Sequence, residues 1–203
     1  MLVYNIVMYT SLNAKAYEKG AAFISSKKGG VLLILWSFFE ASFWFIAPDF
    51  LLGIFGIVKP KEKNRFFILA LTASFFGGIT YYIFNILSFD TMSLVLKETP
   101  FVTEKMMSFI RNVYDTYGLP GVLFQSFSFM SFKIWTHIAV EFNLNPLGYF
   151  SLVMISRSLR LYPVTLVASL MGKFFPNFIR KHFVTILILY SLSFIVMLVA
   201  MEN

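Results

Sequence analysis

The sequence predicts an all-α integral membrane protein built as an inverted repeat, in which a re-entrant helical hairpin and a transmembrane helix occur twice. The first observation is composition: 58% of the 203 residues are hydrophobic and 13% are charged, whereas about a quarter of a soluble domain is charged. The second is that two apolar runs are interrupted by charged residues and helix breakers. The third is an alternation of basic and acidic connecting segments.

The first interrupted run extends from Val31 to Val58 and contains Glu40, Pro48 and Asp49. An ionised carboxylate in hydrocarbon costs about 3 kcal/mol or more, so a segment that only crosses a bilayer would not carry two. Pro48 lacks a backbone donor and disfavours helix at the residue before it. We therefore expect a break near residues 47–49, with the backbone there buried in protein or lining a wet cavity.

The part of this run after the break, Phe50–Val58, is under half the length needed to cross the hydrocarbon core. Residues 31–58 are therefore predicted to form a re-entrant hairpin, although two long tilted helices remain the alternative. Residues 1–30 precede it. They are too short and mixed to span, and we expect an interfacial amphipathic helix with a flexible joint at Gly29-Gly30.

Uncharged or nearly uncharged runs predict the spanning helices. Residues 66–89 carry no charge, residues 183–200 form a plain apolar final span, and residues 148–172 form a span that carries Arg157 and Arg160. Small residues at four-residue spacing along the first of these predict close helix packing. Residues 119–146 contain two short apolar runs around Lys133, which predicts a second re-entrant hairpin.

The charges of the connecting segments predict the topology. Segments 15–28, 59–65 and 173–182 are basic, which places them and the N-terminus in the cytoplasm. Segment 90–117 has a net negative charge, and its part from Phe101 to Tyr117 is predicted to form an amphipathic surface helix outside. The two units of hairpin plus helix, together residues 31–172, then run in opposite directions, which is the usual plan of secondary transporters.

Glu40 and Asp49 are the candidate proton-coupling residues. Glu40 lies among aromatic side chains, where loss of solvation makes it a plausible proton carrier, or it forms a structural pair with Lys133 or an arginine. Asp49 either takes part in chemistry or caps a helix starting at Phe50.

Lys133, Arg157 and Arg160 are the candidate binding residues for a lipid phosphate. The two arginines are three residues apart on one helix face, so they could hold a phosphate together. Alternatively they neutralise the two acids, and Lys133 could extend to an interface. Two carboxylates against three cations leave a spare positive charge, which suits a phosphate monoester.

Several function classes lack the residues they need. The sequence contains no cysteine and two histidines, with no metal-ligand spacing and no nucleophile–base arrangement. We therefore expect neither an enzyme nor a protein with a cofactor or metal. The net charge of +7 arises from basic clusters beside apolar runs, which is typical of loops facing anionic headgroups rather than nucleic acid.

Motifs in both halves resemble the DedA family of the SNARE-associated Golgi protein (VTT domain) superfamily, and the small YqaA-like branch in particular. The residues that carry the resemblance are Glu40, Pro48-Asp49, Leu51-Leu52, Gly56, Tyr117-Gly118, Phe132-Lys133-Ile134, Thr136 and Ser156–Arg160. The resemblance implies facing re-entrant hairpins in a bacterial inner membrane, and flippase or scramblase activity on undecaprenyl phosphate or phospholipid, in some members coupled to protons. The chain departs from the family at Gln125–Ser128, Met130-Ser131 and Val140-Glu141.

Three functions therefore compete at the level of sequence. The first is translocation of a phosphate-bearing membrane lipid, coupled to protons through Glu40 or Asp49. The second is proton-linked transport of a small ion or solute through the same charges. The third is a membrane assembly or homeostasis factor whose charges are structural. A homo-oligomer is compatible with each of them.

Overall fold

A computed structural model describes residues 2–43, 48–99, 102–128 and 130–200, and every regular element in these ranges is helical. This confirms the predicted all-α class. Two helices, 60–87 and 146–174, are long and apolar enough to cross a membrane. A third candidate arises if the bent helix pair within residues 11–42 is one span. The described part of the chain is thus that of a membrane protein.

The N-terminal fifth of the chain consists of α1 (Leu2–Ser25) and α2 (Lys27–Ser42), which meet at an angle of 75°. The bend lies at Ser26, whose hydroxyl accepts a hydrogen bond from Gly29 N at 3.2 Å and caps α2. The predicted joint at Gly29-Gly30 is therefore wrong, because both glycines belong to the first turn of α2. A Cβ at Gly29 would lie 2.5 Å from the Phe23 carbonyl oxygen, so this glycine permits the sharp bend.

The first hairpin region contains α2 and α3 (Asp49–Val58), separated by Phe43 to Pro48. α3 starts directly after Pro48, as the proline predicts, while Ala47 lies outside the described residues. At about 1.5 Å per residue, the 16 residues of α2 and the 10 of α3 rise about 24 Å and 15 Å. Both are shorter than the hydrocarbon core of about 30 Å.

The short turn η1 (Pro60–Glu62) leads into α4 (Lys63–Leu87), which is followed by α5 (Phe89–Lys97) and α6 (Glu104–Tyr117). The uncharged helix predicted to extend to Phe89 thus ends at Leu87, because the backbone turns at Ser88. α6 is amphipathic as predicted. Its buried face contains Met107, Ile110, Val113 and Tyr114.

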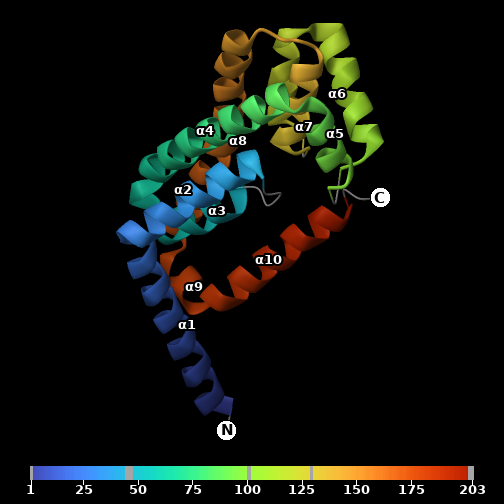
Figure 1. Cartoon of the computed structure of the whole chain (residues 1–203). Helices are drawn as coiled ribbons and strands as arrows, with labels where there is room; N and C mark the ends of the chain where they lie inside the picture. The colour runs from blue at the N-terminus through green and yellow to red at the C-terminus, as the bar shows by residue number, and fades with distance from the viewer. Residues whose placement is uncertain (1, 44–47, 100–101, 129, 201–203) are drawn as a thin grey trace.

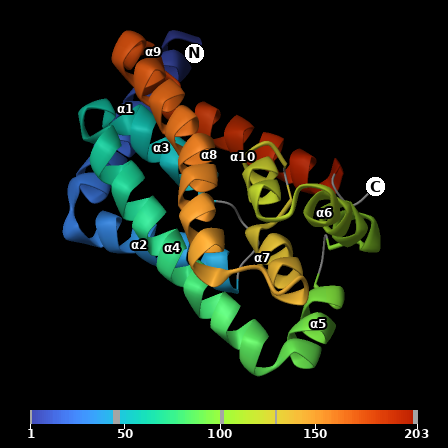
Figure 2. The same ribbon diagram turned by 90° about the horizontal axis from the view of Figure 1, so that it is seen from above.

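The second hairpin region contains η2 (Leu119–Ser126), a 3₁₀ helix, and α7 (Phe132–Glu141). α8 (Pro146–Phe174), α9 (Pro176–Lys181) and α10 (Phe183–Ala200) complete the fold (Figure 1). Asn13 of α1 fixes the start of α10, since its side-chain oxygen accepts from Val184 N at 2.8 Å. α10 then runs back toward the end of the molecule that carries α6 (Figure 2).

The two hairpin regions pack on the two long helices in a reciprocal pattern. α2 packs on α4 and α3 on α8, whereas η2 packs on α8 and α7 on α4. Glycines permit the closest of these contacts. A Cβ at Gly77 of α4 would lie 2.3 Å from the Phe38 carbonyl oxygen of α2, and one at Gly172 of α8 would lie 2.1 Å from the Ile57 carbonyl oxygen of α3. These contacts hold α2 against α4 and α3 against α8.

Candidate functional site

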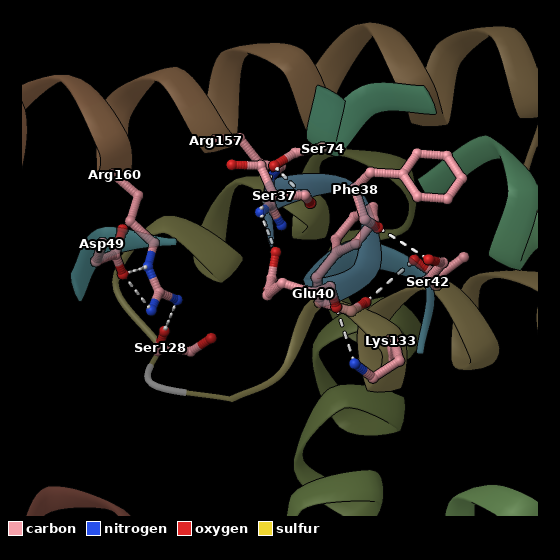
Figure 3. Close-up of polar contacts among 12 residues, drawn as sticks. Ser37, Phe38, Glu40, Ser42, Asp49, Ser74, Ser128, Lys133, Arg157 and Arg160 are labelled. Atoms are coloured by element: carbon pink, nitrogen blue, oxygen red, sulfur yellow. Dashed lines mark hydrogen bonds and ion pairs between the residues drawn. The ribbon is translucent and has the colours of Figure 1, made fainter. Parts of the chain in front are cut away.

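The centre of the site is a buried ion pair between the two halves of the chain (Figure 3). Arg157 Nη2 of α8 donates to Glu40 Oε2 of α2 at 2.6 Å, and the side chains are 7% and 8% exposed. Arg157 also donates to Ser74 Oγ of α4 at 3.1 Å and lies 4.8 Å over the Phe132 ring of α7. One guanidinium therefore contacts three other helices, and its charge is compensated by the carboxylate.

Lys133 approaches Glu40 from the opposite side. Its Nζ donates to the backbone oxygen of Glu40 at 2.8 Å, near the carboxyl end of α2. A cation at this position is stabilised by the negative end of the helix dipole. Figure 3 shows the Glu40 carboxylate pointing to Arg157 and its carbonyl to Lys133. Lys133 thus joins the second hairpin region to the first, and it is buried rather than extended to an interface.

A second ion pair joins Asp49 of α3 to Arg160 of α8. Arg160 Nη2 lies 2.8 Å from Asp49 Oδ2, and the side chains are 25% and 18% exposed. Arg160 Nη1 also donates to the Ser128 carbonyl oxygen at 3.2 Å. The predicted cap by Asp49 is wrong. α3 begins at Asp49 itself, Pro48 is the N-cap without a side-chain hydrogen bond, and the Asp49 carboxylate is used by Arg160 instead.

Both ion pairs line one small polar cavity. Its volume is about 10 Å³, which is about the least that holds one water molecule. The lining residues are Glu40, Pro48, Asp49, Gln125, Ser126, Phe132, Ser156, Arg157, Arg160 and Leu161. Four of the five predicted residues therefore converge on one cavity, and Lys133 does not line it.

Two buried polar atoms of cavity-lining residues have no hydrogen-bond partner among the described residues: Asp49 Oδ1 and Arg157 Nε. One is an acceptor and the other a donor, so a single polar group in the cavity could serve both. The Asp49 oxygen can equally take up a proton. The site is thus equipped to exchange a proton or a small polar group at the junction of the two pairs.

The sequence interpretation missed the neutral polar residues of the site. Ser126 Oγ lies 2.9 Å from Ser156 Oγ, and Ser156 Oγ lies 3.3 Å from Gln125 Oε1. Ser74 is one of the small residues at four-residue spacing for which the sequence predicts only packing, although its hydroxyl accepts from Arg157. One signal was available for Ser74: it lies four residues before Gly78 and shares the α4 face that packs against both hairpin regions.

Other ionisable residues lie away from the cavity. His137 is buried, with Nδ1 at 2.6 Å from Asn85 Oδ1 and Nε2 at 3.2 Å from Ser93 Oγ. Glu141 at the end of α7 accepts from Arg111 of α6 at 2.8 Å. That hydrogen bond is the main reason why the pKa of the Arg111 guanidinium is raised. These contacts attach α5 and α6 to α7.

Comparisons with known proteins leave the family open. No family model matches the chain, and no solved structure matches it. An uncharacterized protein from Haemophilus influenzae is 26% identical over 147 residues, which are 71% of this chain and 74% of that protein. No cluster of three or more potential metal ligands occurs in the described part of the chain.

Proposed function

We propose that this protein moves a phosphate-bearing lipid across a membrane, with proton exchange at the cavity between its two ion pairs. The observation that carries the proposal is the position of the acids and bases. Both acids come from the first hairpin region, both arginines come from α8, and all four line one cavity. Intramembrane ionisable residues at such a junction typically mark a transport or proton pathway.

The reciprocal packing supports an inverted repeat. Each long helix contacts the first limb of the hairpin region in its own half and the second limb of the other one. The limbs are also short: η2 has 8 residues and α7 has 10, so each rises only about 15 Å. Two re-entrant hairpins that meet near the middle of the membrane explain both features.

The two ion pairs suit different tasks. Glu40–Arg157 is almost fully enclosed and tied to three helices, so it holds the halves together. Asp49–Arg160 is more exposed, and one Asp49 oxygen is unpaired among the described residues. Protonation of Asp49 would free the Arg160 guanidinium, whose planar donors match a phosphate. The Lys133 ammonium adds a further positive charge near the site. The resemblance to the DedA family is consistent with this assignment.

Reconstitution of the purified protein into vesicles with a fluorescent phosphate-bearing lipid tests the proposal. The readout is the loss of fluorescence when an impermeant quencher reaches flipped lipid. We expect the wild type to exceed empty vesicles and Arg160→Gln to approach them. Glu18→Gln serves as the control, because Glu18 pairs with Arg180 on the surface away from the cavity. A folded wild-type protein that moves no lipid contradicts the proposal, and electrogenic flux without lipid movement supports an ion transporter instead.

The closed geometry of both ion pairs favours a second candidate, a membrane assembly factor whose charges are structural. The double variant Asp49→Arg with Arg160→Asp separates the two candidates, because this is the pair assigned to transport. It retains opposite charges at the same two positions but reverses their polarity within the site. If the charges are only structural, the double variant should fold and restore cellular function. If they serve transport, the double variant should fold but remain inactive.

A further inference from the structure

A groove lies directly beside Arg160, between α3, α8 and α10. Its polar part has a volume of about 490 Å³ and is lined by Asp49, Phe50, Ser126, Phe127, Ser128, Leu159, Arg160, Val164, Tyr190 and Ser193. Its apolar part has a volume of about 470 Å³ and is lined by Gly53, Ile57, Pro163, Val164, Val167, Ala168, Met171, Ile186 and Tyr190. Val164 and Tyr190 line both parts, so the two adjoin.

Tyr190 connects α10 to α3 at one side of the groove. Its ring stacks on Phe50 with centroids 4.9 Å apart, and its hydroxyl donates to the Asp49 carbonyl oxygen at 3.3 Å. A Cβ at Gly53 would lie 2.6 Å from the Tyr190 hydroxyl oxygen, so the ring rests against the backbone of α3. α10 is thereby attached to α3 at this point.

The polar part holds the Asp49–Arg160 ion pair, so it favours an anionic group when Asp49 carries a proton, as the proposed function requires. Arg160, a quarter exposed, is then an unpaired cation, and α3 begins at Asp49, which places the positive end of its dipole at the same point. The cavity shared by the two ion pairs is also lined by Asp49, Ser126 and Arg160, so the groove and the cavity meet there. The apolar part offers hydrophobic side chains such as Val167 and Met171 and carries no charged residue.

A second groove on α8 provides an internal comparison. It has a volume of about 520 Å³ and is lined by Phe67, Met154, Ile155, Ser158, Leu159, Tyr162 and Pro163. Its size is similar, but no charged residue lines it. A plain hydrocarbon chain would occupy both grooves alike, whereas a chain with an anionic headgroup would prefer the groove that ends at Arg160.

We infer that the groove between α3, α8 and α10 binds a membrane lipid with an anionic phosphate headgroup. The headgroup lies against Arg160, Ser126 and Ser128, and one hydrocarbon chain extends past Tyr190 along Val167 and Met171. This inference rests on the proposed function for the fate of the lipid, and it adds the path by which the lipid reaches the cavity. The lipid enters this groove laterally from the bilayer, alongside α10.

Photo-crosslinking of the full-length protein in nanodiscs tests the inference. The probe is an alkyl phosphate with a diazirine in its chain, and adducts are mapped by mass spectrometry. We expect adducts on residues 163–171 and 186–190, displaced by dodecyl phosphate but not by dodecanol or inorganic phosphate. Displacement by dodecanol to the same degree, or adducts spread equally over the groove of Ile155, would overturn the inference.

Two matched variants on α8 sharpen the test. Val167 and Ile155 are 56% and 52% exposed, so each tolerates a larger side chain, and each lines only one of the two grooves. Val167→Trp should reduce crosslinking about tenfold, which corresponds to a modest loss of binding free energy, while Ile155→Trp should leave it unchanged. Equal crosslinking in both variants contradicts the inference.

The variants also separate this inference from the proposed function. Specific crosslinking in a wild-type protein that moves no lipid supports the groove and contradicts translocation. Lipid movement that persists unchanged in Val167→Trp supports translocation and overturns the groove as its path. Arg160→Lys retains the charge but not the planar donors, and we expect it to bind dodecyl phosphate more weakly than the wild type.

Discussion

The two acidic residues of the site differ in how many of their oxygen atoms already have a partner. Glu40 uses its carboxylate for Arg157 and its carbonyl oxygen for Lys133, so it serves two cations at once. Asp49 engages one carboxylate oxygen with Arg160 and keeps the other unpaired among the described residues. Of the alternatives that the sequence leaves open for Glu40, the contacts favour the structural pair with an arginine, whereas Asp49 is the acid with remaining capacity.

Removal of one member of the enclosed pair should destabilise the protein strongly. Glu40→Gln leaves Arg157 as an uncompensated buried cation, which costs about 3–5 kcal/mol of unfolding free energy. Combining Glu40→Met with Arg157→Met removes both charges and should recover most of this loss. Denaturant unfolding in detergent measures both variants. A single variant as stable as wild type would show that the pair contributes nothing.

A neutral residue in place of Asp49 should increase transport. The Asp49 carboxylate pairs with Arg160 of α8 and shares the cavity with Glu40 and Arg157. Asp49→Asn removes the negative charge that competes with a lipid phosphate for Arg160, so this variant should move the fluorescent lipid faster than the wild type in the vesicle assay. Transport no faster than that of the wild type would show that Asp49 does not compete with the lipid for Arg160.

The elements show which features a sequence can determine. Long uncharged runs and Pro48 predicted the helices and the first interruption, because hydrophobic length and proline act locally. The contacts of Tyr190 of α10 with α3, the bend at Ser26 and the 3₁₀ form of η2 were not predicted. The first of these depends on which distant element packs against α10: Tyr190 meets Phe50 and Gly53 of α3.

The contact between α2 and α4 depends on one glycine. A Cβ at Gly77 would lie 2.3 Å from a backbone oxygen of α2, which cannot move aside as a side chain could. Gly77→Ala should therefore lower the unfolding free energy by about 1–3 kcal/mol. Gly20→Ala is the control: its Cβ would lie 3.5 Å from the Phe183 ring, and it should be neutral or stabilise α1 by up to about 1 kcal/mol. Thermal unfolding in detergent compares them.

At the scale of the whole molecule, five charged residues from both halves of the sequence lie together at one junction. The sequence could name them because charges in apolar runs are conspicuous. It could not decide their pairing, since either acid could have met either arginine. The pairing follows from the geometry of packing: α3 lies along α8 near Arg160, and α2 crosses α4 near Ser74, which leaves Glu40 beside Arg157.

The proposed re-entrant topology makes a prediction for the whole chain. Because the sequence contains no cysteine, single cysteines can be introduced directly and labelled with an impermeant maleimide. Lys28→Cys and Lys61→Cys, at the ends of the first hairpin region, should react only from the cytoplasmic side. Asp115→Cys in α6 should react only from the other side.

The end of α2 decides between a re-entrant hairpin and two full spans. Phe43 is exposed at the end of α2, and Ser128 lies in the break of the second hairpin region. If both breaks lie within the membrane, Phe43→Cys should not react from outside and Ser128→Cys should not react from the cytoplasm. The limbs that lead to these positions, α2 of about 24 Å and η2 of about 15 Å, are both shorter than a core of about 30 Å. Reaction of Phe43→Cys from outside would replace the first hairpin by two spanning helices and remove the symmetry on which the translocation mechanism depends.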